Sequence, residues 1–182
     1  DRLTVGMVKE TGTSFPARQR LVAYHEAGHA IMGALTPDYD QVAKVTILPR
    51  TNGAGGFTLF APSEERLASG MYSKRYLKGQ LAVALGGRVA EELVYGMDEV
   101  TTGASGDLQQ VRNIARRMVA QWGYSKDKLS AIAWEQPQGN GGFGPQGASL
   151  ETESRIDEEV KELCAEAYTV CKKMLSDNRE LL

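Results

Sequence analysis

The chain has 182 residues, of which 42% are hydrophobic and 24% are charged, and its formal net charge at pH 7 is -2. This length and apolar content suffice for one folded domain with its own hydrophobic core. The nearly balanced charge gives no general attraction to nucleic acid, and no apolar run approaches the roughly 20 residues of a membrane-spanning helix, so neither a nucleic-acid partner nor a membrane segment is expected within these residues.

Residues 1–16 contain two glycines and a proline and show no helical periodicity, so we expect an irregular segment here. Because the chain begins with Asp1 and not with a methionine, we expect it to be a piece of a longer protein. An apolar helix is predicted over residues 17–35, and Pro37 is expected to stop it.

Within this helix, residues 25–29 read H-E-A-G-H and contain the only two histidines of the chain. Positions four apart on a helix lie on one face about 6 Å apart, so His25 and His29 can bind one metal ion together. Glu26 points to the adjacent side, where it reaches a metal-bound water more easily than the metal. This is the pattern of a zinc peptidase, with two zinc ligands and a general base. The apolar flanks of the motif argue against the alternative of two surface histidines without a function.

Two short strands are predicted after this helix. Residues 42–48 alternate in character and include β-branched side chains, and residues 57–60 form a second short run. The turn-rich stretch 49–56 lies between them, so we expect the two strands to be antiparallel neighbours. The second strand is predicted to be an edge strand that binds an extended substrate through main-chain hydrogen bonds. Its candidate substrate-binding residues are Phe57, Thr58, Leu59 and Phe60.

The remainder of the chain is predicted to be mostly helical. Residues 64–95 read largely as helix, with an uninterrupted run from Gln80 to Val94. Gly86 and Gly87 lie inside this run, where each glycine costs about 1 kcal/mol relative to alanine. We expect a close backbone approach as the compensation, with the small surface at residues 27–28 as a candidate neighbour.

Amphipathic spacing predicts two further helices, over residues 108–122 and 156–175. Between them, residues 135–149 are rich in glycine, glutamine and proline and have little apolar surface to bury, so a mobile loop is expected. The predicted fold class is mainly α (α+β), a helical zinc metallopeptidase domain with one small β-sheet.

A catalytic zinc ion normally has three protein ligands and a water, and this chain has no third histidine. The third ligand is therefore expected to be a carboxylate, either Glu91 or Glu92 on the predicted second helix, or Asp107. Each candidate has an alternative role. Glu92 can pair with Arg88 one helical turn away, and Asp107 can cap a helix that starts at Leu108. The residue pattern alone leaves these possibilities open.

Four motifs occur in order along the chain: H-E-A-G-H at 25–29, K-V-T-I-L-P-R at 44–50, A-L-G-G-R-V-A-E-E at 84–92 and V-T-T-G-A-S-G-D-L-Q-Q at 100–110. From about Tyr24 to its end, the chain resembles the FtsH family of membrane-anchored, ATP-dependent zinc proteases. The resemblance implies that Asp107 is the third zinc ligand and that the glutamate pair has a structural or supporting role. The family usually has asparagine where this chain has Gly106.

The resemblance also implies a domain layout. The whole chain is expected to be a zinc metallopeptidase domain, with residues 1–16 as a linker from an ATPase module, 17–124 as the metal-binding part, 135–149 as the mobile loop and 150–182 as a C-terminal helical part. ATP is expected to be used by that module, because this chain has no G-x-x-x-x-G-K-[ST] phosphate loop.

The family works as a hexamer of identical or different subunits, degrades unfolded or damaged membrane and soluble proteins, and is anchored through segments that this chain does not contain. The stretch A-P-S-E-E-R-L at 61–67 is most similar to plastid members, which suggests the thylakoid membrane, with the bacterial plasma membrane and the mitochondrial inner membrane as alternatives. Two other functions are compatible with the residues. One is a proteolytically inactive structural subunit of the same assembly, and the other is a free-standing zinc peptidase with a glutamate as third ligand.

Overall fold

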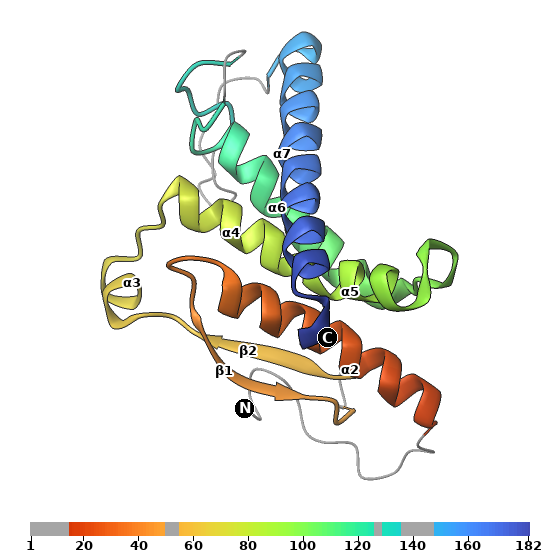
Figure 1. Cartoon of the computed structure of the whole chain (residues 1–182). Helices are drawn as coiled ribbons and strands as arrows, with labels where there is room; N and C mark the ends of the chain where they lie inside the picture. The colour runs from red at the N-terminus through yellow and green to blue at the C-terminus, as the bar shows by residue number, and fades with distance from the viewer. Residues whose placement is uncertain (1–14, 50–54, 126–128, 136–147) are drawn as a thin grey trace.

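The computed structural model describes residues 15–49, 55–125, 129–135 and 148–182. The predicted linker up to residue 14 and the greater part of the predicted loop, residues 136–147, lie outside the described residues. The described chain is mainly helical and has one two-stranded sheet, which confirms the predicted fold class. In Figure 1 the hairpin lies along one side of helix α2, and the other long helices gather on the opposite side.

Helix α2, Pro16–Leu35, carries the H-E-A-G-H motif. It begins with a proline at its first turn, where the missing N–H is not needed, and it ends just before Pro37, as predicted. Its buried residues recur on one face, which packs against α5 at Gly28 and against strand β2 at Glu26 and Gly33. These buried residues are Glu26, Gly28, His29, Met32 and Gly33.

The hairpin consists of β1, Gln41–Thr46, and β2, Phe57–Ala61, which pair antiparallel with Val45 opposite Thr58. The antiparallel pairing was predicted, but β1 ends two residues before the predicted end at residue 48. There the hydroxyl of Thr46 accepts a hydrogen bond from the main-chain N–H of Leu48, and this local bond replaces ladder pairing.

Helices α3, Glu64–Ser69, α4, Lys74–Ala84, and α5, Gly86–Tyr95, occupy the region predicted as largely helical. The prediction of one uninterrupted run through Gly86 was wrong, because the helix breaks at Leu85. The break lets α5 lie against α2 at a point where both helices have glycine. A Cβ atom on Gly28 would lie 2.2 Å from the carbonyl oxygen of Gly86, so the predicted close approach of these two backbones is confirmed.

Two short 3₁₀ turns, η1, Met97–Glu99, and η2, Thr102–Ala104, lead from α5 into α6, Ser105–Ala120. Helix α6 thus begins three residues before the predicted start. The alternative role of Asp107 as the helix cap is therefore wrong: Ala104 is in the cap position, and Asp107 lies inside the first turn.

Helix α7, Leu150–Asp177, begins earlier than predicted, with the hydroxyl of Ser149 accepting a hydrogen bond from the N–H of Thr152, and the 3₁₀ turn η3, Arg179–Leu181, follows it. It packs across α4, α5 and α6 and also touches α2 (Figure 1). Among the largest side chains buried between these helices are Met32, Leu81, Val89, Met118, Ile156 and Leu175. None of the described helices combines the length and hydropathy needed to cross a lipid bilayer.

Candidate metal centre

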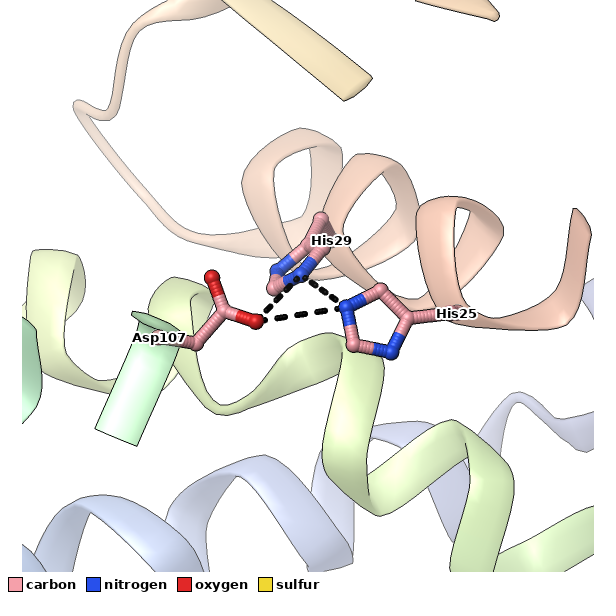
Figure 2. A group of neighbouring side chains, drawn as sticks. All are labelled: His25, His29 and Asp107. Atoms are coloured by element: carbon pink, nitrogen blue, oxygen red, sulfur yellow. Dashed lines mark hydrogen bonds and ion pairs between the residues drawn. The ribbon is translucent and has the colours of Figure 1, made fainter. Parts of the chain in front are cut away.

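Three predicted ligands, from two distant parts of the chain, converge on one point. His25 and His29 project from successive turns of α2, and Asp107 projects from the first turn of α6 (Figure 2). The Nε2 atom of His25 lies 3.1 Å from Nε2 of His29 and 3.2 Å from Oδ2 of Asp107. The third side of this triangle, from Nε2 of His29 to Oδ2 of Asp107, is 3.6 Å.

These separations fit a tetrahedral metal site. Zinc binds imidazole nitrogen and carboxylate oxygen at about 2.0–2.2 Å, which places neighbouring ligand atoms of a tetrahedron about 3.3–3.5 Å apart. The three measured separations of 3.1, 3.2 and 3.6 Å lie around that value. Two histidines and one carboxylate therefore offer three of the four positions of such a site.

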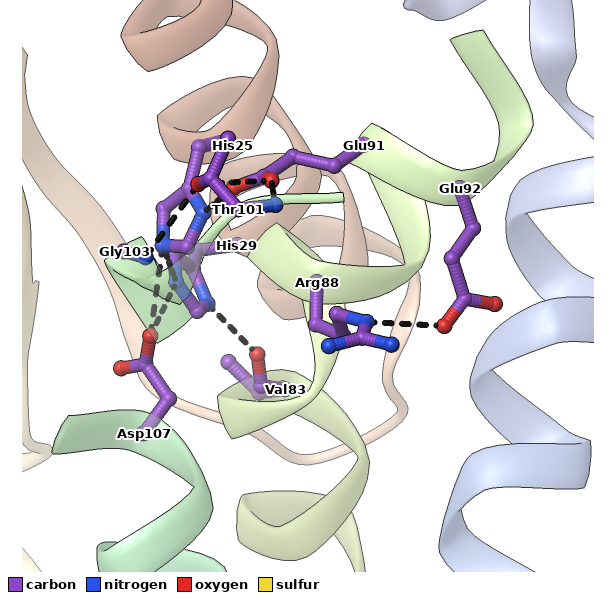
Figure 3. Close-up of polar contacts among 9 residues, drawn as sticks. All are labelled: His25, His29, Val83, Arg88, Glu91, Glu92, Thr101, Gly103 and Asp107. Carbon is purple, nitrogen blue, oxygen red and sulfur yellow. Dashed lines mark hydrogen bonds and ion pairs between the residues drawn. The ribbon is translucent and has the colours of Figure 1, made fainter. Parts of the chain in front are cut away.

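The opposite ring nitrogens of both histidines are held by acceptors, as Figure 3 shows. Nδ1 of His25 lies 2.7 Å from Oε1 of Glu91, and Nδ1 of His29 lies 2.8 Å from the carbonyl oxygen of Val83. Because these oxygens can only accept, each Nδ1 carries the proton and each Nε2 presents a lone pair. Two nitrogen lone pairs and a carboxylate oxygen then face one another, an arrangement that a cation stabilises.

Glu91 and Glu92, the alternative candidates for the third ligand, do not lie at the point where the three ligand atoms meet (Figure 3). Glu91 is completely buried and accepts hydrogen bonds from the N–H and the hydroxyl of Thr101, at 2.8 and 3.0 Å, in addition to the bond with His25. Glu92 is bound by Nε of Arg88 at 2.9 Å and by the hydroxyl of Tyr168. Glu91 thus orients a candidate ligand from the side away from the metal position.

The predicted base, Glu26, is 7% exposed and lies on α2 between the two histidines. The hydroxyl of Thr58 donates to its Oε2 atom at 2.8 Å. Burial raises the pKa of Glu26 above its ordinary value, and the Thr58 hydrogen bond and the nearby histidines offset only part of this change. A carboxylate with a raised pKa is better suited to accept a proton from water near neutral pH.

In the absence of a metal ion, the pKa values of His25 and Asp107 are shifted in opposite directions. Burial acts to lower the pKa of His25, but its hydrogen bonds with Asp107 and Glu91 outweigh burial and leave this pKa above its ordinary value. Burial acts to raise the pKa of Asp107, but the hydrogen bonds with His25 and His29 outweigh it and leave this pKa well below its ordinary value. Without a metal ion, the charged forms of both His25 and Asp107 are therefore favoured.

The three ligand atoms and Glu26 line a cavity of about 430 Å³ between α2, the hairpin and α4. Strand β2 contributes Phe57, Thr58 and Phe60 to its wall, whereas Leu59 does not line it and is 38% exposed. The structure therefore brings three of the four predicted substrate-binding residues to the cavity. A polypeptide lying along β2 would pass the metal position and the base together.

Several groups of this site have weak or no sequence signals. The carbonyl of Val83, which holds His29, is a main-chain group that any residue could provide at this position. Tyr39 and Gln80 line the cavity from the turn after α2 and from α4, but neither belongs to a recognisable motif. Thr101 lies within the motif at 100–110 that also contains Asp107, but no residue pattern indicates its role as a hydrogen-bond donor to Glu91.

Residues 13–182 match peptidase family M41. Over the whole chain, an ATP-dependent zinc metalloprotease FtsH 3 of Synechocystis is 50% identical, and the chloroplastic ATP-dependent zinc metalloproteases FTSH 1 of Oryza sativa and of Arabidopsis thaliana are each 48% identical. The chain spans 30%, 27% and 26% of the lengths of these three relatives.

Proposed function

This chain belongs to peptidase family M41, and we propose that it is the zinc-dependent endopeptidase domain of an ATP-dependent, membrane-anchored protease of the FtsH type. One observation carries the proposal: the ligand atoms of His25, His29 and Asp107 meet beside a buried glutamate at the wall of an open cavity. Two nitrogens, one carboxylate oxygen and a free fourth position are the donor set of a catalytic zinc ion.

In the proposed mechanism His25, His29 and Asp107 would hold a zinc ion. When bound, zinc polarises the carbonyl of the scissile peptide and makes a water molecule more acidic. Glu26 accepts the proton of the attacking water through its carboxylate and then passes it to the nitrogen of the departing amine. Glu91 and the Val83 carbonyl keep the two imidazole rings turned so that each Nε2 faces the metal.

The substrate is proposed to be an unfolded polypeptide, which adds to the hairpin as an antiparallel strand. In the part of the chain that is described, β2 pairs with β1 along one edge and with no strand along the other, so a further strand could add there. Main-chain recognition of this kind does not depend on the substrate sequence, which suits a protease that degrades damaged proteins.

The larger assembly is also a proposal. The relatives are named ATP-dependent, which supports an ATPase module that works together with this domain. We propose that residues 1–16 connect the domain to this module and that the complete protein forms a hexamer. The chloroplastic and cyanobacterial relatives favour anchoring in a thylakoid membrane, through segments other than those described here. Within the chain, we retain the proposed division into a metal-binding part, 17–124, and a C-terminal helical part, 150–182.

The proposal is tested by measuring bound zinc and peptidase activity on the same preparation. We expect about one zinc ion per chain and cleavage of an unfolded casein substrate that stops when a chelator removes the metal and returns when zinc is added. A chain that binds zinc but cleaves neither casein nor short peptides would instead support a proteolytically inactive subunit. Absence of zinc binding would overturn the proposed metal centre.

A further inference from the structure

Strand β2 reaches the predicted base through the side chain of Thr58. Its Oγ1 atom lies 2.8 Å from Oε2 of Glu26 and 3.1 Å from the main-chain carbonyl oxygen of the same residue. A hydroxyl has one proton to donate, and here both of its acceptors belong to Glu26. This contact joins two residues 32 positions apart in the chain, so it fixes the hairpin to the turn of α2 that carries the metal-binding motif.

The contact lies at the wall of the cavity and is partly buried. Glu26 is 7% exposed, and Gly56 packs so closely against it that a Cβ atom on this glycine would lie 3.0 Å from Cγ of Glu26. Valine at this position would fill the place of the Thr58 hydroxyl with a methyl group, so a solvent molecule could not substitute for the lost hydrogen bond there. The hydrogen bond fixes the rotation of the carboxylate by holding one oxygen, and it leaves the second oxygen to accept a proton.

The activity of a general base depends strongly on the orientation of its side chain. Proton transfer requires the base to lie within about 2.6–3.2 Å of the group that gives up the proton, and an unheld glutamate side chain has several rotamers. Thr58 also belongs to the strand proposed to bind the substrate, so the same residue joins the base and the substrate platform. A small shift of β2 would then move the base as well.

We infer that Thr58 is a positioning residue for peptide cleavage: its hydroxyl holds the Glu26 carboxylate in the orientation that the general base requires. This inference rests on the proposed function. A purely structural role for Thr58, as a residue that favours β-strands, would be fulfilled equally well by valine, which has the same shape and a high strand propensity. The hydroxyl is therefore the group to be tested.

The kinetic test compares Thr58→Val, which removes the hydroxyl, with Thr58→Ser, which keeps it. We expect Thr58→Val to lower kcat about tenfold or more, with KM and zinc content close to wild type, and Thr58→Ser to recover most of the loss. Thr46→Val is the matched control, a threonine on the neighbouring strand with its hydroxyl bonded to Leu48, and it should leave kcat unchanged. An unchanged kcat in Thr58→Val, a change in KM alone, or no recovery in Thr58→Ser would overturn the inference.

A second measurement does not depend on activity. In the zinc-free chain, a double-mutant cycle with Thr58→Val and Glu26→Ala reports the coupling between the two side chains in the equilibrium constant for unfolding. We expect a coupling of about fivefold or more, because the hydrogen bond involves a charged and buried group. Coupling near unity would overturn the hydrogen bond itself. If the cycle shows clear coupling but the zinc-loaded wild type cleaves no peptide, the hydrogen bond is supported, whereas the proposed function and the catalytic role of Thr58 are both overturned.

Discussion

Glu26 lies between His25 and His29 on helix α2, but its replacement should have a different effect from theirs, since of these three side chains only the histidines belong to the candidate metal site. Replacement of Glu26 by glutamine keeps the size of the side chain and removes its ability to accept a proton at neutral pH. We expect Glu26→Gln to lose nearly all peptide cleavage, by about 100-fold or more, while its zinc content stays at the wild-type level. Parallel zinc analysis and peptide assays check this, and substantial turnover by the variant would mean that another residue acts as the base.

The third ligand can be tested with variants of two acidic side chains that have different partners. Asp107 lies 3.2 and 3.6 Å from the histidine nitrogens, whereas Glu92 is bound to Arg88 and Tyr168. We expect Asp107→Ala to weaken zinc binding about 100-fold or more and Glu92→Ala to leave it near wild type. Competition with a fluorescent zinc chelator measures both affinities. If Asp107→Ala kept full affinity while the glutamate variant lost it, the assignment of ligands would be reversed.

The metal-free chain should show a pH dependence that is opposite to that of the zinc-loaded chain. The pKa of Asp107 is lowered, so its stabilisation is present above its unfolded-state pKa of about 3.9 and is lost as pH falls through the folded-state value. The pKa of His25 is raised, so its stabilisation is present below its unfolded-state pKa of about 6.5 and is lost as pH rises through the folded-state value. The pair therefore stabilises the metal-free fold most between about pH 4 and pH 6.5.

Denaturant unfolding of wild type and Asp107→Asn, both in chelator, measures this effect from pH 4 to pH 9. We expect the wild type to exceed the variant most in the acidic range, by about 1–2 kcal/mol, and the difference to decline by pH 8–9. Stabilisation of the wild type by added zinc should instead increase with pH, because protons compete with the metal for the histidines. A difference between the two metal-free proteins that is independent of pH would contradict this account.

At the level of secondary-structure elements, the contact between α2 and α5 depends on two glycines that face each other. A Cβ atom on Gly28 would lie 2.2 Å from the carbonyl oxygen of Gly86 and 2.7 Å from Cβ of Ala90, and a backbone carbonyl cannot turn aside as a side chain can. The same two helices carry His25 and the residue that orients it, Glu91. Their separation therefore also sets the geometry of the candidate metal centre.

We expect Gly28→Ala to destabilise the fold by about 3 kcal/mol or more and to weaken zinc binding, because α5 must move away from α2. Gly106→Ala is the matched control, since a Cβ atom there meets nothing within 4 Å and the residue lies in helix α6. That control should be neutral or more stable by up to about 1 kcal/mol. Thermal and denaturant unfolding measure the stabilities of the two variants. Equal stabilities would show that α2 and α5 accommodate the added methyl group without strain.

For the molecule as a whole, Arg116 joins segments that are far apart in sequence. Its guanidinium binds Glu135 at 2.5 Å, Glu153 at 2.7 Å and Asp157 at 3.3 Å, so it connects α6 both to Glu135 and to the first turns of α7. We expect Arg116→Met to destabilise the fold by about 1–2 kcal/mol and to speed amide exchange near the start of α7, with zinc content unchanged. Arg155→Met, which removes only an exposed pair with Glu151 within α7, should cost about 0.5 kcal/mol or less. Equal effects of the two variants would rule out a special role for Arg116.

The sequence predicted local features better than distant ones. Helix α2, the antiparallel hairpin and the amphipathic helices follow from periodicity and from prolines and glycines, which act on neighbouring residues. The meeting of Asp107 with the histidines came from family resemblance, because nothing local relates residues 82 positions apart. The break at Leu85 is not predicted because it accompanies the packing of α5 against α2 at Gly28. The early start of α6 is not predicted because an aspartate directly before Leu108 also fits a helix cap. Zinc binding by the three residues stays a prediction.

The long separation between the histidines and Asp107 also has a consequence for biosynthesis. At about 5–20 residues per second, the ribosome needs roughly 4–16 s to add the 82 residues between His25 and Asp107, and α7, which packs across the helices of the site, is made later still. During this interval the nascent chain offers a pair of histidines without its carboxylate partner. Such a pair would bind a divalent ion more weakly than the complete set of three ligands, so we expect stable metal binding only after Asp107 has joined the site.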